Sequence, residues 1–298
     1  MRQASLRADI LCLVTALIWG FAFVAQRMGM DHIGPMAFNG IRFALGAMVL
    51  APLAIRSLRY PPPAPFLPGA KDGFPWLGGL VAGSVLFAGA TLQQVGMLYT
   101  TAGKAGFITG LYVVLVPLLG LFFGQKAARG DVIGAVAAAV GLYFLSVTED
   151  FTLAPGDGLE LIGAVFWAGH VLVIGWLSPR TRALPLALCQ YAVCSILSLV
   201  AAFIFEQTTW AGISGAGWAI LYGGILSVGV AYTLQVVAQR DANPTHAAVL
   251  LSFETVFAAV GGALFLDESL GGRGLFGCCL MFAGMLAAQL WPRKPASA

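Results

Sequence analysis

Ten long apolar stretches, separated by Gly, Pro and charged residues, dominate this sequence. They cover residues 8–27, 35–55, 74–98, 102–124, 131–148, 157–177, 185–205, 216–239, 243–266 and 273–291. Because a membrane-spanning helix needs about 20 apolar residues, each stretch predicts one transmembrane helix. In a chain of 298 residues, the connections between ten such helices are too short to hold a soluble domain. We therefore expect an all-α integral membrane protein with ten transmembrane helices.

The composition excludes other classes of protein. Apolar residues make up 59% of the chain and charged residues 10%, so a water-soluble globule could not cover its surface with polar groups. The chain is also too apolar to be disordered. A net charge of +3, carried by scattered basic residues, excludes nucleic acid as a partner. The expected partners are the lipid bilayer and a small-molecule substrate.

The sequence shows no pattern for a metal, a cofactor or ATP. All five cysteines lie inside apolar stretches, where they predict small packing residues rather than a disulfide or metal framework. Neither an H-E-x-x-H motif nor a Walker A motif occurs, which excludes a metalloprotease and a self-contained ATP-driven pump. We expect no metal, no cofactor and no catalytic residue.

The basic residues predict the orientation in the membrane. With a cytoplasmic N-terminus, twelve Lys and Arg residues lie in inside segments and three, Arg27, Lys104 and Arg273, in outside connections. The positive-inside rule therefore predicts that both termini are cytoplasmic. The expected location is a bacterial-type cytoplasmic (inner) membrane.

An internal repeat carries the functional inference. A shift of 142 positions aligns Trp76 with Trp218, and the triplet Thr91–Gln93 with the triplet Thr233–Gln235. Tryptophan and glutamine are rare in this chain, so their coincidence indicates a duplication. Chance similarity among apolar helices is the alternative.

The two halves, residues 1–150 and 151–298, hold five predicted helices each. Because five is odd, the second half must enter the membrane from the opposite side. Such inverted repeats are the architecture of alternating-access transporters, in which the halves exchange conformations.

Three segments resemble the drug/metabolite transporter superfamily in its ten-helix EamA-type branch. They are Ala16–Phe23 in the first span, and Leu251–Ala258 with Leu264–Leu270 in and after the ninth. The resemblance covers essentially the whole chain and implies export of metabolites; the family's aromatic amino-acid exporters are similar in size and in their aromatic-rich spans. Thr255 stands where the family commonly has proline, so a kink there is expected from Gly261–Gly262 instead.

Two tryptophans lie near the predicted middle of their spans. Trp19 is about eleven residues into the first span and Trp167 about ten into the sixth, close to the bilayer centre at about 1.5 Å per residue. Tryptophans of an aromatic belt lie at headgroup depth instead. We predict that Trp19, Trp167 and Phe23 wall a substrate cavity, with plain helix packing as the alternative.

Glutamines lie late in the third and eighth spans. Gln93 and Gln94 fall near the predicted outer mouth, and Gln235 and Gln239 near the inner mouth. Tyr232 shares one helical face with Gln235 and Gln239 by its three- and four-residue spacing. These side chains predict a polar pathway or gate, with Tyr232 at the substrate. Hydrogen bonding between helices is the alternative.

Three ionisable residues, Arg42, His170 and Glu254, lie deep in predicted spans, where a charge is costly. Glu254 is the candidate for proton coupling, or else a structural partner of Arg42 or of the backbone. His170 could bind a substrate carboxylate or a neighbouring helix. Arg42 could pair with a carboxylate of the substrate or of the protein. We expect all three at the substrate site.

The sequence therefore predicts a secondary transporter and not an enzyme: an exporter of aromatic or other neutral amino acids, or similar small metabolites, by alternating access. Export follows from the resemblance alone. A drug or other metabolite exporter is the alternative within the class. Gly212–Gly215 matches the short G-x-S-G pattern of some intramembrane serine proteases, so an intramembrane hydrolase is the alternative from another class. The fifth and tenth spans carry few polar residues, and we expect them at the periphery, supporting the others or forming a homodimer.

Overall fold

The computed structural model describes residues 2–60, 76–123, 129–146, 155–241 and 244–290. Within these ranges every regular element is a helix, as expected for an all-α membrane protein. Seven helices among the described residues are long and apolar enough to cross a membrane, and three shorter apolar ones are Val132–Leu145, Leu250–Phe265 and Gly272–Gly284. The predicted boundary between the halves, at residue 150, lies outside the described residues.

Each predicted span corresponds to one helix or to a series of consecutive helices. The elements are α1 (Arg2–Gly29), α2 (Pro35–Ser57), α3 (Trp76–Gly96), α4 (Ala102–Gly110), α5 (Tyr112–Gly120), η1 (Leu121–Phe123), α6 (Arg129–Ser146), α7 (Pro155–Leu177), η2 (Ser178–Arg180), α8 (Ala183–Phe205), α9 (Trp210–Gly215), α10 (Gly217–Leu221), η3 (Tyr222–Tyr232), α11 (Thr233–Ala238), α12 (Pro244–Ser252), α13 (Glu254–Phe265) and α14 (Gly272–Leu290). η1 and η2 are short 3₁₀ helices, whereas η3 is a π-helix.

Two spans are interrupted, at Leu111 between α4 and α5 and at Phe253 between α12 and α13. The backbone angles agree, with φ −59° and ψ −16° at Leu111 and φ −58° and ψ −16° at Phe253. These positions are separated by the same 142 residues as the sequence repeat. Gly261 and Gly262, at which the sequence prediction placed a kink, lie inside α13, and the span is interrupted at Phe253 instead. They serve close packing: an added Cβ would lie 2.9 Å from Val24 at the first and 2.4 Å from Glu268 at the second.

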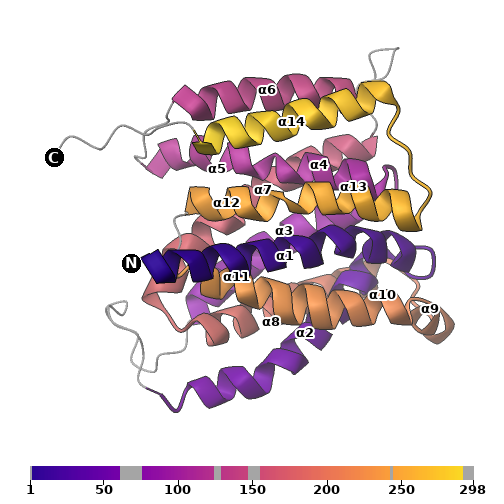
Figure 1. Cartoon of the computed structure of the whole chain (residues 1–298). Helices are drawn as coiled ribbons and strands as arrows, with labels where there is room; N and C mark the ends of the chain where they lie inside the picture. The colour runs from indigo at the N-terminus through magenta and orange to yellow at the C-terminus, as the bar shows by residue number, and fades with distance from the viewer. Residues whose placement is uncertain (1, 61–75, 124–128, 147–154, 242–243, 291–298) are drawn as a thin grey trace.

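The helices pack mainly against partners that are distant in the sequence (Figure 1). α2 packs along α8, α3 contacts both α7 and α8, and α1 contacts α13 and η3. α6 and α14 lie side by side at one edge of the molecule. Their backbones meet at Gly141 and Gly277, where an added Cβ would lie 2.7 Å and 2.6 Å from the other glycine's carbonyl oxygen. The fifth and tenth predicted spans are thus peripheral.

Two glutamates bind helix N-termini at the end of the bundle where α1 connects to α2. The carboxylate of Glu206 accepts hydrogen bonds from the backbone N–H groups of Met36 and Ala37, each at 2.8 Å, at the start of α2. Glu268 accepts from Ala102 and Gly103, at 2.7 Å and 2.8 Å, at the start of α4. A carboxylate is favourable there, since the first N–H groups of a helix lack partners within it. Both contacts join the C-terminal half of the chain to the N-terminal half.

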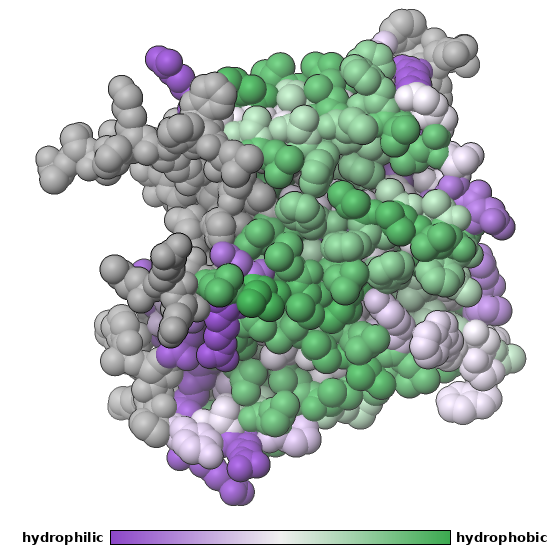
Figure 2. Space-filling view, in the orientation of Figure 1, coloured by the Kyte–Doolittle hydropathy of each residue, from purple (hydrophilic) through white to green (hydrophobic). Residues whose placement is uncertain are grey.

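The face shown in Figure 2 carries a broad apolar band, with hydrophilic residues gathered toward both ends. Large apolar side chains project fully from the protein, as with Phe203, which is 90% exposed. An exposed apolar surface of this extent fits contact with lipid chains rather than with water.

Candidate functional site

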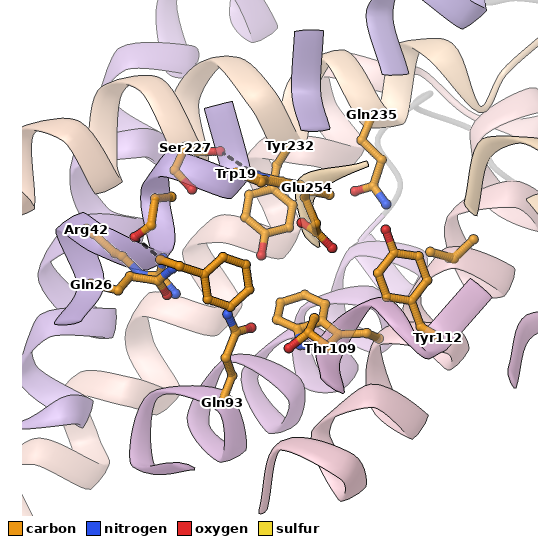
Figure 3. A pocket seen from close by; sticks show the side chains of 14 residues that line it. Trp19, Gln26, Arg42, Gln93, Thr109, Tyr112, Ser227, Tyr232, Gln235 and Glu254 are labelled. Carbon is orange, nitrogen blue, oxygen red and sulfur yellow. Dashed lines mark hydrogen bonds between the residues drawn. The ribbon is translucent and has the colours of Figure 1, made fainter. Parts of the chain in front are cut away.

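A cavity lies at the meeting point of both halves of the chain. Its wall is formed by side chains from many helices, namely α1, α2, α3, α4, α5, α7, η3, α11 and α13 (Figure 3). Eight of the eleven predicted site residues line it: Trp19, Phe23, Arg42, Gln93, Trp167, Tyr232, Gln235 and Glu254. The cavity therefore brings together residues that are far apart in the sequence.

The other three predicted residues, His170, Gln94 and Gln239, are buried outside this lining and bond neighbouring helices. The Nε2 atom of His170 lies 2.8 Å from the side-chain oxygen of Gln190 on α8. Gln94 donates to a backbone carbonyl of α1 at 3.4 Å, and Gln239 to one of α7 at 3.0 Å. The structure thus gives these three side chains a place in helix packing.

Tyr232 is at the centre of an aromatic cluster. The centroid of its ring lies 4.5 Å from that of Trp19, 5.8 Å from Phe43 and 6.2 Å from Trp167. Tyr191 adds a further ring, also at 6.2 Å. Trp167 is stacked on Tyr232 with an angle of 27° between the ring planes. Such a cluster offers a ligand flat apolar faces together with polar ring edges.

The π-helix η3, of 11 residues, ends at Tyr232. π-helical turns are rare and occur frequently at functional sites. The backbone carbonyl of Ser227 in η3 accepts a hydrogen bond from Trp19 Nε1 in α1 at 3.2 Å. The hydroxyl of Thr15, which donates to the backbone carbonyl of Leu11 at 2.8 Å, lies 3.3 Å from that of Ala231 in η3. The Trp19 bond joins α1 to η3 and holds the Trp19 ring beside Tyr232.

Arg42 reaches the cavity from α2 and is only 2% exposed. Its Nε donates a hydrogen bond to the side-chain oxygen of Asn39 at 2.9 Å. Its guanidinium carbon lies 5.0 Å and 5.6 Å from the ring centroids of Phe43 and Phe38. Among the described residues, Arg42 makes no ion pair with a protein carboxylate.

Glu254 is the first residue of α13, directly after the interruption at Phe253. It is 4% exposed and lines the cavity. In Figure 3 its carboxyl group, the hydroxyl of Tyr112 and the amide of Gln235 point toward the same part of the cavity. The ion pairs of the described residues do not include Glu254, so Arg42 is not its structural partner.

Four polar side chains of the lining, Gln26, Thr109, Tyr112 and Ser227, were absent from the sequence prediction. Gln26 lies two helical turns after Trp19, so helical spacing could have identified it. Tyr112 is the counterpart of Glu254 at the 142-residue offset, so the repeat could have identified it. Thr109 and Ser227 carry no such signal. Behind the wall, the fully buried Glu160 accepts a hydrogen bond from Thr109 at 3.2 Å, although the sequence prediction placed only three ionisable residues deep in the protein.

The serine of the G-x-S-G pattern, Ser214, lies in the short helix α9, and its hydroxyl donates to the backbone carbonyl of Ala211 at 2.9 Å. No hydrogen bond joins Ser214 to a histidine among the residues that the structure describes. The nucleophile and base of a serine hydrolase have to be within hydrogen-bond reach of each other. This site therefore gives the hydrolase alternative no support.

Comparison with known proteins identifies the family. The EamA-like transporter family matches residues 6–147 and, separately, residues 154–288. This chain belongs to the EamA-like transporter family. The family is part of the drug/metabolite transporter superfamily, and its members are transporters.

Several relatives of this EamA-like transporter are themselves named as transporters. An uncharacterized transporter of Archaeoglobus fulgidus is 33% identical over 96% of this chain and 86% of its own length. The uncharacterized inner membrane transporter YedA of Escherichia coli is 26% identical over 94% and 90%. The threonine/homoserine exporter RhtA of Salmonella typhimurium is 30% identical over 55% and 56%. A solved crystal structure is similar with a TM-score of 0.70 at 20% identity, over 95% of this chain and 97% of that one, which shows the fold alone.

Proposed function

We propose that this EamA-like transporter is a secondary exporter of aromatic or other neutral amino acids, or of similar small metabolites. The observation that carries the proposal is a set of unpaired polar atoms in a cavity whose wall includes five aromatic side chains. The side-chain oxygens of Gln26 and Gln235 and Nε1 of Trp167 have no hydrogen-bond partner among the described residues. Buried polar groups are nearly always hydrogen-bonded. A solute with both donors and acceptors beside an apolar body would satisfy them.

Transport by alternating access requires two conformations that expose the cavity to opposite sides of the membrane. The interruptions at Leu111 and Phe253 support this mechanism, because they occur at repeat-equivalent positions with the same backbone angles. Gln93 and Gln235, also repeat-equivalent, both line the cavity. In the proposed cycle the two halves are inverted copies that exchange conformations about these interruptions.

The proposed setting is a bacterial-type inner membrane with both termini in the cytoplasm. The 12-to-3 distribution of basic residues supports this orientation, and the printed name of YedA supports the membrane. The name of RhtA supports both export and amino acids as cargo. A homodimer through the peripheral helices α6 and α14 stays a prediction.

Glu254 is the proposed site of proton exchange. Ionisable groups inside a membrane protein commonly mark proton relays, and this carboxyl group faces the cavity without a cationic protein partner among the described residues. We expect Glu254→Gln to keep substrate exchange and to lose accumulation driven by a pH gradient. Unchanged pH-driven accumulation by this variant would remove the proton role.

The test of the function is flux into liposomes that contain only this protein. Radiolabelled phenylalanine and threonine would be compared with the hydrophobic cation tetraphenylphosphonium, with and without a pH gradient. Saturable flux of an amino acid is the expected result. Flux of tetraphenylphosphonium alone would favour the drug-exporter alternative, and cleavage of a membrane peptide without any flux would reverse the functional class.

A further inference from the structure

The guanidinium group of Arg42 lies in the wall of the cavity with no anionic protein group beside it among the described residues. Charges buried in proteins are normally paired, because an isolated charge loses its hydration without compensation. A buried charge can lack a protein partner when its partner is a bound ligand. Because Arg42 lies in the cavity wall, its position indicates a ligand with a negative charge.

The protein groups that face this cation are neutral. Phe38 and Phe43, from the same helix, present their rings to it. Tyr232 from η3 and Cys194 from α8 are the titratable groups that interact with it, and a phenol and a thiol are ordinarily uncharged at pH 7. Aromatic faces attract a cation but supply no negative charge, so the protein leaves the charge of Arg42 uncompensated.

Asn39, which is fully buried, fixes the direction of the Arg42 side chain. Its side-chain oxygen accepts the hydrogen bond from Arg42 Nε at 2.9 Å, and its side-chain nitrogen donates to the backbone carbonyl of Ala90 on α3 at 3.0 Å. Arg42 is thereby tied to a second helix through one intermediate residue. Its two terminal nitrogens have no hydrogen-bond partner among the described residues. They are therefore available to a ligand in the cavity that Arg42 lines.

We propose that Arg42 binds the carboxylate of the transported solute and that Asn39 is its positioning residue. The inference rests on the proposed function and narrows its substrate class to solutes with a free carboxylate. A guanidinium group binds a carboxylate through two parallel N–H···O bonds, with a geometry that selects this group. Hydrophobic amines and cationic drugs lack the carboxylate, and the buried cation repels them.

This assignment also orients the substrate. Arg42 and Glu254 approach the cavity from different sides, and the ring of Tyr232 lies between them in the view of Figure 3. A carboxylate held by Arg42 places the remainder of the solute along the rings of Tyr232 and Trp19. Glu254 then stays available for proton exchange.

The experiment measures binding by isothermal titration calorimetry on the full-length protein in lipid nanodiscs at pH 7. The ligands are phenylalanine, 3-phenylpropionate, phenylalaninamide and phenethylamine, which share the ring and differ in the carboxylate. The wild-type protein is expected to bind the two carboxylates at least tenfold more tightly than the amide and the amine. A bidentate charged contact readily supplies such a ratio.

Four variants then assign this preference to residues. Arg42→Gln should reduce the preference for carboxylates to less than twofold, whereas Arg42→Lys should keep part of it. Asn39→Asp places a competing carboxylate beside Arg42. It should therefore weaken the binding of phenylalanine about tenfold and leave the binding of phenylalaninamide unchanged. A merely structural role of Asn39 would not produce this difference between the two ligands. Arg27→Gln is the matched control, because Arg27 is partly exposed and pairs with Asp31 outside the cavity.

The outcomes separate the two proposals. If the wild-type protein binds the amide as tightly as phenylalanine, or if Arg42→Gln keeps the preference, the role of Arg42 is overturned and the transport function stands. If no amino acid binds or moves across liposome membranes, the proposed function fails, and the inference fails with it. Should Arg42→Gln not fold, the wild-type ligand series and Asn39→Asp decide the question.

Discussion

The third span of each half has the same landmarks and a different backbone. Trp76 begins α3 and Trp218 lies in α10, and each is 70% exposed. Toward the other end of these spans, Gln93 and Gln235 both line the cavity. Between the landmarks, α3 is a continuous α-helix, whereas the second copy passes through α10, the π-helix η3 and α11. The aligned landmarks thus have similar surroundings, whereas the backbone geometry between them differs.

The difference is concentrated at Tyr232 and its counterpart, Ala90. Tyr232 carries the ring around which the aromatic cluster of the cavity is built. Ala90 is buried and contributes a backbone carbonyl, which holds Asn39 and, through it, Arg42. At this pair of positions, the second half thus adds a ring to the aromatic cluster, whereas the first half supports the charged group. Positions that the sequence repeat aligns thus contribute different chemical groups to the site.

The largest expected effect comes from giving position 232 the alanine of its counterpart, position 90. Tyr232→Ala should weaken the binding of phenylalanine at least tenfold in binding or counterflow measurements, because the substituted residue no longer offers a ring to the ligand. Removing a core ring also costs about 3–5 kcal/mol of folding stability, so Tyr232→Leu is the milder companion. Tyr232→Phe should stay within about twofold of the wild type if the ring is what matters. Wild-type affinity in a folded Tyr232→Leu protein would show that the ring only packs helices.

A smaller loss of affinity is expected from the glutamines that line the cavity, Gln93 and Gln235, and a loss of stability instead from Gln239, which packs against α7. Gln235→Met should lower affinity about fivefold without lowering the melting temperature, because the amide oxygen of Gln235 has no partner among the described residues. Gln93→Met should behave in the same way if the repeat-equivalent positions share a role.

Gln239→Met on the same segment is the contrasting variant. It removes the hydrogen bond to the backbone carbonyl of Val171, so it should lower the melting temperature by a few degrees and change affinity less than twofold. Ligand binding and thermal unfolding in one detergent would provide both quantities. The distinction between cavity and packing glutamines fails if Gln235→Met and Gln239→Met change affinity and melting temperature in the same proportion.

The sequence predicted the helices and most of the lining because both follow from hydropathy and periodicity. Gln93 and Gln235 were found through the repeat, since rare residues at one offset identify equivalent positions. Trp19 and Trp167 were found from their depth in the predicted spans. The interruptions were not found, because they occur at residues without special backbone preferences, whereas Pro117 is accommodated inside α5. The partners of buried polar groups depend on helix packing, which periodicity does not contain.

The smallest expected effect concerns the threonines of the repeated triplet. The hydroxyl of Thr233 lies 3.0 Å from that of Tyr191, whereas the hydroxyl of Thr91 is buried without a partner among the described residues. Thr233→Val should therefore cost about 1 kcal/mol of unfolding free energy, and Thr91→Val should be neutral or slightly stabilising. Tyr191→Phe combined with Thr233→Val should cost less than the sum of the single changes, because the two variants remove the same bond. Equal losses for both threonine variants would mean that the two third spans differ in backbone geometry alone.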